Sequence, residues 1–192
     1  MGSPIKFNWE NCKLETISYG HGITTTPLQA TAVYAALTNG GKIIKPNLVK
    51  VKNEKKNNRL VSEETSKTIN EILRKVVTDE EGTAKLADIQ GYRVGGKTGT
   101  SQNYKNKNEN LNTFISIFPS NKPKYALLVM LENPKVAKNL IYNYKGMKIK
   151  AFRNEAGWNS VYVAGKIIEK IGPILAINNY EFTEQNVVKK FN

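Results

Sequence analysis

The spacing of apolar residues along the chain predicts three helices. The first begins at Thr26-Pro27-Leu28-Gln29, which combines an N-cap threonine, a proline at the first helical position and a glutamine three residues after the cap. Gly40 follows the last periodic residue and is expected to end this helix. The predicted apolar face repeats at helical spacing and consists of Leu28, Ala32, Ala35 and Ala36.

Two further helices follow from the same kind of pattern. Ser62 is the expected N-cap of the second, with Glu63 and Glu64 in its first turn. Its predicted apolar stripe is Ile69, Ile72, Leu73 and Val76. The third helix is expected to end at Gly172-Pro173, because proline cannot donate a backbone hydrogen bond. Its predicted apolar stripe is Val161, Ala164, Ile167, Ile168 and Ile171.

Three strands are predicted between the second and third helices, over residues 92–101, 112–118 and 124–132. The last two are apolar runs of strand length, and the first is compatible with an extended run around Lys97-Thr98-Gly99. The turn-rich segment 119–123 joins the last two, which predicts a hairpin. Both of these strands are apolar on two faces, so helices are expected to cover both sides of the sheet. Residues 42–51 are expected to be extended, and the charged segment 135–153 to form a loop.

These elements predict an α+β fold in which helices flank an antiparallel sheet. At 192 residues and 40% hydrophobic composition, the chain is expected to form a single domain over residues 1–192. Residues 1–16 are assigned to an N-terminal segment and residues 173–192 to a C-terminal tail. No apolar run approaches the roughly 18 residues that a membrane-spanning helix needs.

The net charge and the single cysteine and histidine limit the kinds of site and partner that the chain can have. The formal net charge is +13, but the lysines are spread through polar loops, such as 50–59 and 104–112, with few aromatic residues among them. We therefore expect no nucleic-acid partner. The single cysteine, Cys12, excludes an intrachain disulfide and a cysteine metal site. The single histidine, His21, lies between two glycines and is expected to have a structural or surface role.

One stretch fits two incompatible chemistries. Residues 91–98 satisfy the phosphate-loop pattern of Gly, four residues, Gly-Lys-Thr, which would make the chain a nucleotide-binding protein. That site requires a helix to leave the loop, and the following residues 101–110 are polar, with four asparagines and no apolar period. The other interpretation takes Lys97-Thr98-Gly99 as the Lys-Thr-Gly signature of active-site serine acyl transferases, where the triplet lies on a strand.

Longer segments resemble one family. Residues 17–30, with Ser18-Tyr19-Gly20-His21-Gly22-Ile23, and residues 34–41 are similar to the sequence that class B penicillin-binding proteins carry between their second and third active-site motifs. Residues 91–100 look most like the septal, cell-division branch of that family. The resemblance runs from about Ile17 to about Ile171.

The resemblance implies a peptidoglycan D,D-transpeptidase (β-lactamase-like) domain, whose partners are D-Ala-D-Ala stem peptides, β-lactam antibiotics and, for the parent protein, the division machinery. Lys97 would tune the serine site electrostatically, Thr98 would bind the terminal carboxylate, and the Thr100 amide would donate to the oxyanion. Gly99 would let the peptide or lactam approach closely. This chemistry needs no metal or organic cofactor, and none is expected. The parent protein would be anchored in the inner membrane, with this domain on the periplasmic side.

The family's other two motifs, Ser-x-x-Lys and Ser-x-Asn, precede the block at residues 17–30. We expect both to be missing, so that the chain is the C-terminal half of the transpeptidase domain and inactive alone. The Ser-x-Asn at Ser101-Gln102-Asn103 stands on the wrong side of Lys-Thr-Gly. A non-catalytic interaction module of the division machinery remains the alternative.

Truncation is also expected to leave both outer edges of the sheet unpaired, together with the Leu28, Ala32 and Ala35 face of the first helix. The chain is therefore expected to dimerise or swap segments through these surfaces, or to cover them with residues 4–19.

Overall fold

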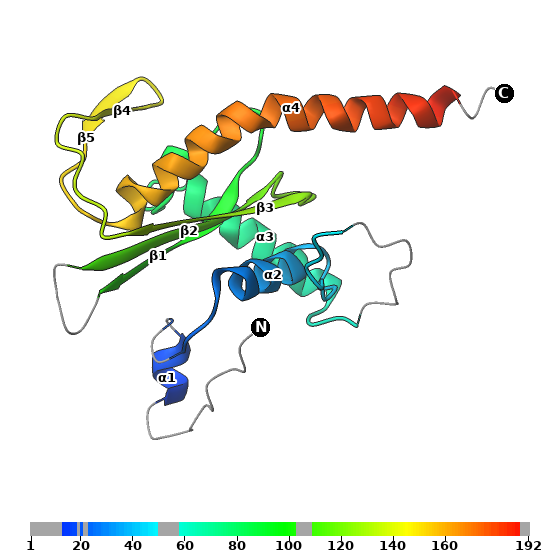
Figure 1. The fold of residues 1–192 in the computed structure, drawn as a ribbon, viewed down its shortest axis with the longest axis horizontal. Helices are drawn as coiled ribbons and strands as arrows, with labels where there is room; N and C mark the ends of the chain where they lie inside the picture. Colours follow the sequence, from blue (N-terminus) through cyan, green and yellow to red (C-terminus); the bar gives the residue numbers. More distant parts are fainter. Residues whose placement is uncertain (1–12, 19, 21–22, 50–57, 103–108, 189–192) are drawn as a thin grey trace.

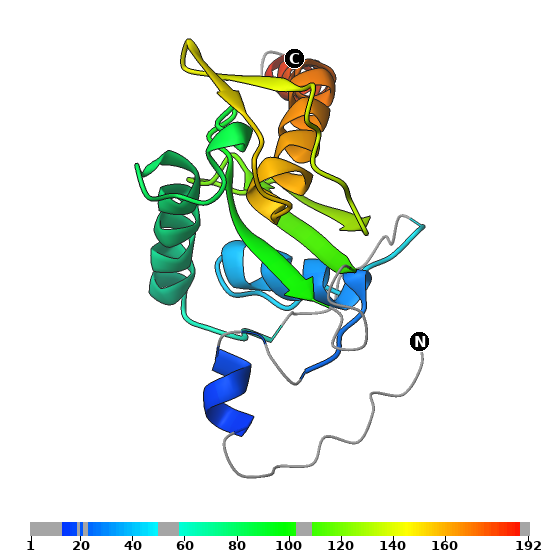
Figure 2. The same ribbon diagram turned by 90° about the vertical axis from the view of Figure 1, so that its left-hand side faces the viewer.

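An antiparallel sheet lies between helices in the computed structural model, which describes residues 13–18, 20, 23–49, 58–102 and 109–188. The long helix α4 (Ser160–Val188) crosses one face of the sheet, and α2 (Pro27–Thr38) packs on the other (Figure 1). Helix α3 (Glu63–Thr78) packs beside β1 and α2 (Figure 2). The predicted α+β architecture is confirmed. Cys12, His21 and most of the segment 1–16 lie outside the described residues.

The sheet has three strands in the order β1-β2-β3, with β1 at Gly95–Gln102, β2 at Asn110–Phe118 and β3 at Tyr125–Glu132. The three predicted strands and the hairpin between the last two are confirmed. β1 begins later than the predicted residue 92. Gly91 and Arg93 have φ angles of 88° and 46°, so the chain is still turning there.

The caps of the first two predicted helices are also confirmed. The Oγ1 of Thr26 accepts a hydrogen bond from the Gln29 amide at 3.2 Å, and the Gln29 side chain accepts one from the Thr26 amide at 3.0 Å. The Ser62 Oγ accepts from the Thr65 amide at 3.0 Å at the start of α3. Gly40 has a φ of 87° just past the end of α2, a conformation that glycine adopts without a Cβ penalty.

The buried stripe of α3 differs from the predicted one. Ile72 is 56% exposed, and the buried positions are Ser66, Asn70, Leu73 and Val77. Hydrogen bonds from the end of α2 and to it explain why α3 buries a different face from the predicted one. The Ser66 Oγ accepts from the Gly40 amide at 3.0 Å, and the Asn70 side-chain amide donates to the Thr38 carbonyl at 3.0 Å. Polar contacts therefore outweigh the apolar periodicity here.

The predicted end of the last helix at Gly172-Pro173 is wrong, because α4 continues through Pro173 to Val188. A proline inside a helix removes one hydrogen bond and disfavours helical geometry at the preceding residue, partly through that residue's Cβ. Gly172 has no Cβ, which relieves that clash. A Cβ at Gly172 would also come within 2.3 Å of the Tyr92 ring, so this position needs glycine for packing as well.

Of the two segments between the predicted elements, one differs from expectation and the other is not tested. Residues 42–49 carry no named strand, only an isolated bridge from Lys42 to Arg59, so their predicted extended conformation stays a prediction, and residues 50–51 lie outside the described part of the chain. The predicted loop 135–153 contains a hairpin of β4 (Ile141–Tyr144) and β5 (Met147–Lys150). Lys145 and Gly146 have φ angles of 49° and 83°, which suits a tight hairpin turn. The four-residue strands and the lysine at the first turn position gave no clear hairpin signal.

The three remaining elements are short: α1 (Lys13–Ser18), η1 (Lys85–Ala87) and η2 (Ala156–Trp158). Among the described residues, no helix is both long and apolar enough to cross a membrane. The predicted α2 face is partly uncovered, since Leu28 is 51% exposed, whereas Ala32 and Ala35 are half-buried.

The main core lies between the sheet, α3, η1 and α4. Three predicted positions of the α4 stripe are completely buried, namely Val161, Ala164 and Ile168. They pack in one cluster with side chains of the sheet and of α3, among them Val94, Phe114, Phe118, Val129 and Val77. The core therefore holds β2 and β3, and Val94 just before β1, against the helices on one side of the sheet.

Replacing Ile168 by alanine is expected to lower the free energy of unfolding by about 2–5 kcal/mol, because it removes a completely buried side chain and leaves a cavity. The matched control is Ile177→Ala on the same helix, where the side chain is 58% exposed and the expected change is within about 0.5 kcal/mol. Urea unfolding followed by circular dichroism measures both. Equal losses in the two variants would contradict the assigned core.

Candidate active site

The Lys-Thr-Gly triplet lies in the middle of β1, as predicted for the acyl-transferase interpretation. The strand continues to Gln102, so no helix begins at the end of the motif, and the structure excludes the phosphate-loop alternative. Side chains alternate between the two faces of a strand. Thr98 and Thr100 therefore share one face of β1, and Lys97 and Gly99 share the other.

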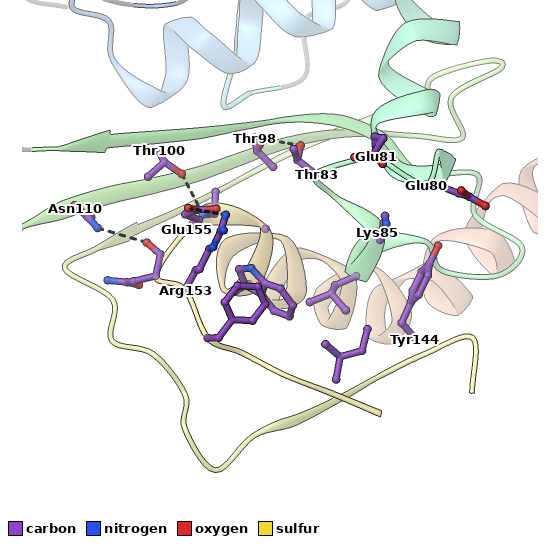
Figure 3. Close-up of a pocket in the computed structure, with 18 residues that line it drawn as sticks. Glu80, Glu81, Thr83, Lys85, Thr98, Thr100, Asn110, Tyr144, Arg153 and Glu155 are labelled. Carbon is purple, nitrogen blue, oxygen red and sulfur yellow. Dashed lines mark hydrogen bonds and ion pairs between the residues drawn. The ribbon is translucent and has the colours of Figure 1, made fainter. Parts of the chain in front are cut away.

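A cavity of about 860 Å³ opens over the face that carries Thr98 and Thr100. It is bounded by the segment after α3, by η2 and by the β4–β5 hairpin region (Figure 3). Its apolar part includes Phe152 and Trp158. Part of the predicted site thus faces an open cavity built from segments far apart in the sequence.

Both threonine hydroxyls on this face are held by hydrogen bonds from other segments. The Thr98 Oγ1 lies 2.9 Å from the Thr83 Oγ1 in the segment after α3. The Thr100 Oγ1 accepts a hydrogen bond from the Ala156 amide at the start of η2, at 3.2 Å (Figure 3). The two hydroxyls are therefore oriented by contacts that the sequence motif does not contain.

The other two residues of the triplet lie away from the cavity. The exposed Lys97 ammonium donates to the Thr98 carbonyl at 2.7 Å. Gly99 faces its cross-strand partner Thr113, and a Cβ on Gly99 would come within 2.6 Å of the Thr113 hydroxyl. The structure therefore supplies an internal reason for this glycine. Of the predicted site residues, Thr98 and Thr100 lie together on one face of β1, and Lys97 lies on the other face.

Charged residues of both signs line the cavity: Glu80, Glu81, Glu155, Lys85 and Arg153. Arg153 and Glu155 form an ion pair at 3.9 Å, but both side chains are more than half exposed, so the pair adds little stability. Within the described residues, no group of three or more His, Cys, Asp or Glu side chains is arranged to hold a metal ion.

A set of asparagines attaches the wall of the cavity to the sheet. The side-chain amides of Asn110 and Asn112 on β2 both donate to the Asn154 carbonyl, at 3.4 and 3.3 Å. The Asn154 side chain in turn donates to the Pro134 carbonyl and accepts from Asn159. These bonds hold the segment before η2 over β2, and this places the Ala156 amide at Thr100.

Aromatic side chains form the outer part of the same wall. Tyr142 on β4 is 2% exposed, packs edge-on against Tyr162 with ring centroids 4.9 Å apart, and donates its hydroxyl to the Trp158 carbonyl. Burial, followed by the charge of ionised Tyr162, raises the pKa of Tyr142 above its ordinary value of 10.0. Phe152 contacts Trp158 at 5.1 Å between ring centroids.

The sequence interpretation missed Thr83, Asn154 and Ala156. Thr83 is 15 residues before Thr98, and Ala156 is 56 residues after Thr100, so no local spacing connects them. The neighbouring glycines, Gly82 and Gly157, are the local feature of the sequence that could have indicated a close approach of these segments. A Cβ on Gly157 would come within 2.6 Å of the Thr83 carbonyl, which shows how closely η2 approaches this segment.

The expectation that the chain holds no Ser-x-x-Lys needs a correction, because Ser3-Pro4-Ile5-Lys6 has that literal spacing. These residues lie outside the described part of the chain. The other seven serines have no lysine three positions on. The described residues therefore do not test whether Ser3 could act as the nucleophile of the family site.

Replacing Tyr142 by phenylalanine is expected to cost about 1 kcal/mol of stability at pH 8, because the Trp158 carbonyl loses its donor. The raised folded-state pKa means that the unfolded chain loses its phenol proton first, so this contribution declines as the pH rises above 10.0. Urea unfolding at pH 8 and pH 11 should show a smaller difference between wild type and variant at pH 11. A difference that grows with pH would contradict this assignment.

Comparisons with known proteins bear on the family to which the chain belongs. The family model described as the penicillin binding protein transpeptidase domain matches residues 2–154. Stage V sporulation protein D of Bacillus subtilis is 38% identical over 136 residues, which cover 62% of this chain and 21% of that protein. The probable peptidoglycan D,D-transpeptidase FtsI of Caulobacter vibrioides is 31% identical over 182 residues, covering 88% of this chain and 29% of that protein.

A solved structure supports the same fold. The transpeptidase domain of the FtsI4 D,D-transpeptidase from Legionella pneumophila aligns with a TM-score of 0.65 and 25% identity, covering 86% of this chain and 55% of that one. The chain spans less than a third of the length of the two sequence relatives above. None of these proteins is named as a non-catalytic module, so the comparisons do not support that alternative. The chain belongs to the penicillin-binding protein transpeptidase domain family.

Proposed function

We propose that this chain is part of a peptidoglycan D,D-transpeptidase that cross-links cell-wall peptides by serine acyl transfer. The observation that carries the proposal is the pair of threonine hydroxyls, Thr98 and Thr100, which lie on one strand face and line one cavity. Family membership and relatives named D,D-transpeptidase support it.

In this reaction a serine oxygen attacks the carbonyl carbon between the two D-alanines of a stem peptide. The C–N bond breaks, the terminal D-alanine leaves with a protonated nitrogen, and the peptide stays on the serine as an ester. The amine of a second stem peptide then attacks the ester. It loses a proton, and the serine oxygen regains one. β-Lactams mimic the first substrate and acylate the same serine.

The residues of β1 are assigned roles by their positions. The hydroxyls of Thr98 and Thr100 bind the terminal carboxylate, and the Thr100 amide donates to the oxyanion of the tetrahedral intermediate. Lys97, on the opposite face of the strand, supplies positive charge toward the serine site. Gly99 carries no side chain, which would let the peptide or lactam approach the strand backbone closely.

The parent protein is proposed to act in cell division, anchored in the inner membrane with this domain in the periplasm. Its relatives FtsI and stage V sporulation protein D support a role in the cell envelope. Within the described sheet, the outer edges of β1 and β3 have no neighbouring strand, so these edges are proposed as sites of self-association in the isolated chain.

Binding of a diacetyl-Lys-D-Ala-D-Ala peptide, followed by NMR titration, tests the proposal. The wild-type chain should bind this acid more tightly than the same peptide with a C-terminal amide. Thr98→Val should weaken binding of the acid by about tenfold or more, because it removes a hydrogen bond to a charged group. Thr68→Val is the control, since Thr68 is an exposed threonine on α3 that bonds only within its helix. Equal affinity of the wild type for acid and amide would contradict the proposal.

The 192-residue chain by itself is expected to form no adduct with a fluorescent penicillin that survives denaturation, because an acyl-enzyme needs a serine held beside a base. Gel fluorescence after boiling measures the adduct. Ser3→Ala is the paired variant. A stoichiometric adduct on the wild type that this substitution abolishes would assign the nucleophile to Ser3 and contradict the expected absence of the motif.

A further inference from the structure

We propose that Thr83 is a positioning residue that commits the Thr98 hydroxyl to donate to an anionic group, so that the site selects a carboxylate over a neutral end. The inference rests on the proposed function, which makes a peptide carboxylate the ligand of Thr98. It adds a residue outside the strand motif and a reason for its effect on specificity.

The hydrogen-bonding capacity of the two hydroxyls leads to this conclusion. A threonine hydroxyl has one proton to donate and two lone pairs to accept with. The Oγ1 atoms of Thr83 and Thr98 are 2.9 Å apart, and either can be the donor in the free chain. A carboxylate only accepts. When one binds at Thr98, both contacts are made only if Thr83 donates to Thr98 and Thr98 donates to the ligand.

A neutral amide end places no such demand, because it carries both donors and an acceptor. It can be satisfied with the Thr83–Thr98 hydrogen bond in either direction. The donation from Thr83 also polarises the Thr98 hydroxyl and strengthens its bond to a charged acceptor. Removing the Thr83 hydroxyl therefore affects an acid ligand more than an amide ligand.

Thr100 already has the arrangement that Thr83 supplies to Thr98. Its Oγ1 accepts a hydrogen bond from the Ala156 backbone amide, at 3.2 Å, and a backbone amide can only donate. The Thr100 proton therefore stays available for a ligand. With a carboxylate bound, each of the two hydroxyls thus accepts a hydrogen bond that leaves its own proton free for the ligand. The donor is the Thr83 side chain for Thr98 and the Ala156 backbone amide for Thr100.

The charges around the cavity make such neutral donors important. Three acidic residues line it, Glu80, Glu81 and Glu155, against two basic ones, Lys85 and Arg153, and Arg153 is paired with Glu155. The lining therefore has no excess of positive charge to attract a carboxylate. Lys97, the cation of the motif, lies on the other face of β1. Selection of an anion at Thr98 and Thr100 then depends on oriented hydroxyl dipoles.

Thr83 is fixed in place by its backbone. The amide of Gly82 donates to the Asp79 carbonyl at 3.0 Å, and the amide of Ala84 donates to the Val76 carbonyl at 3.1 Å, which ties this turn to the end of α3. The Ala84 side chain is completely buried. On the other side, Gly157 lies against the Thr83 carbonyl. A residue held from both sides can orient a neighbouring hydroxyl.

The test uses the 192-residue chain and measures the affinity ratio between the diacetyl-Lys-D-Ala-D-Ala acid and its C-terminal amide by NMR titration. Three variants are compared with wild type. Thr83→Val removes the hydroxyl and keeps the branched shape, Thr83→Ser keeps the hydroxyl, and Thr68→Val is the control for losing an exposed threonine hydroxyl elsewhere. Thermal unfolding is recorded for each, so that a folding defect is recognised.

Thr83→Val is expected to lower the preference for the acid by about fivefold, which is the size of one hydrogen bond, and to change the amide affinity by less than about twofold. Thr83→Ser should retain the wild-type ratio, as should Thr68→Val. Should Thr83→Val unfold, the same ratio is measured on Thr83→Ala.

An unchanged ratio in Thr83→Val, or equal weakening of both peptides, would overturn the role of Thr83 while the proposed function stands. A wild-type chain that does not prefer the acid would overturn the proposed function, and the role of Thr83 with it. A loss of preference in Thr83→Ser equal to that in Thr83→Val would show that the hydroxyl is not the cause.

Discussion

The close approach of β1 to α3 and to β2 is the constraint on which the site depends. A Cβ on Gly95 would lie 3.1 Å from the Arg74 amide nitrogen of α3, and one on Gly96 would lie 2.5 Å from the Ile115 carbonyl and 2.7 Å from the Phe114 ring. The Arg74 guanidinium donates to the Val94 carbonyl at 2.6 Å and to the Asp88 carboxylate at 2.9 Å. Two glycines and one arginine therefore position the strand just before Lys97-Thr98-Gly99.

The strand carries the recognisable motif, but other segments complete its surface. The turn after α3 brings Thr83 to Thr98, and the start of η2 brings the Ala156 amide to Thr100. The asparagines of β2 hold the η2 segment through the Asn154 carbonyl. The orientation of two hydroxyls on β1 thus depends on three separate parts of the chain, and a change in any of them would alter the site without touching the motif.

The two faces of β1 separate two kinds of chemistry. One face presents neutral hydroxyls to a cavity whose lining has no excess positive charge, and the other presents the Lys97 ammonium. In the proposed function, the hydroxyls would bind the carboxylate end of the substrate and the ammonium would supply positive charge toward the serine. The alternation of side chains along a single strand keeps these two groups apart while holding them within three residues of each other.

The sequence by itself determined the helix starts at Thr26 and Ser62, the three strands, the hairpin and the family, because caps, turns, apolar runs and motifs are local signals. It also predicted that Lys97-Thr98-Gly99 lies on a strand. Only the tertiary structure decided which side of α3 is buried, since hydrogen bonds to the end of α2 compete with apolar spacing. The passage of α4 through Pro173 and the contacts of Thr83 and Ala156 were likewise decided there, because packing and hydrogen bonds between distant segments leave no periodic trace in the chain.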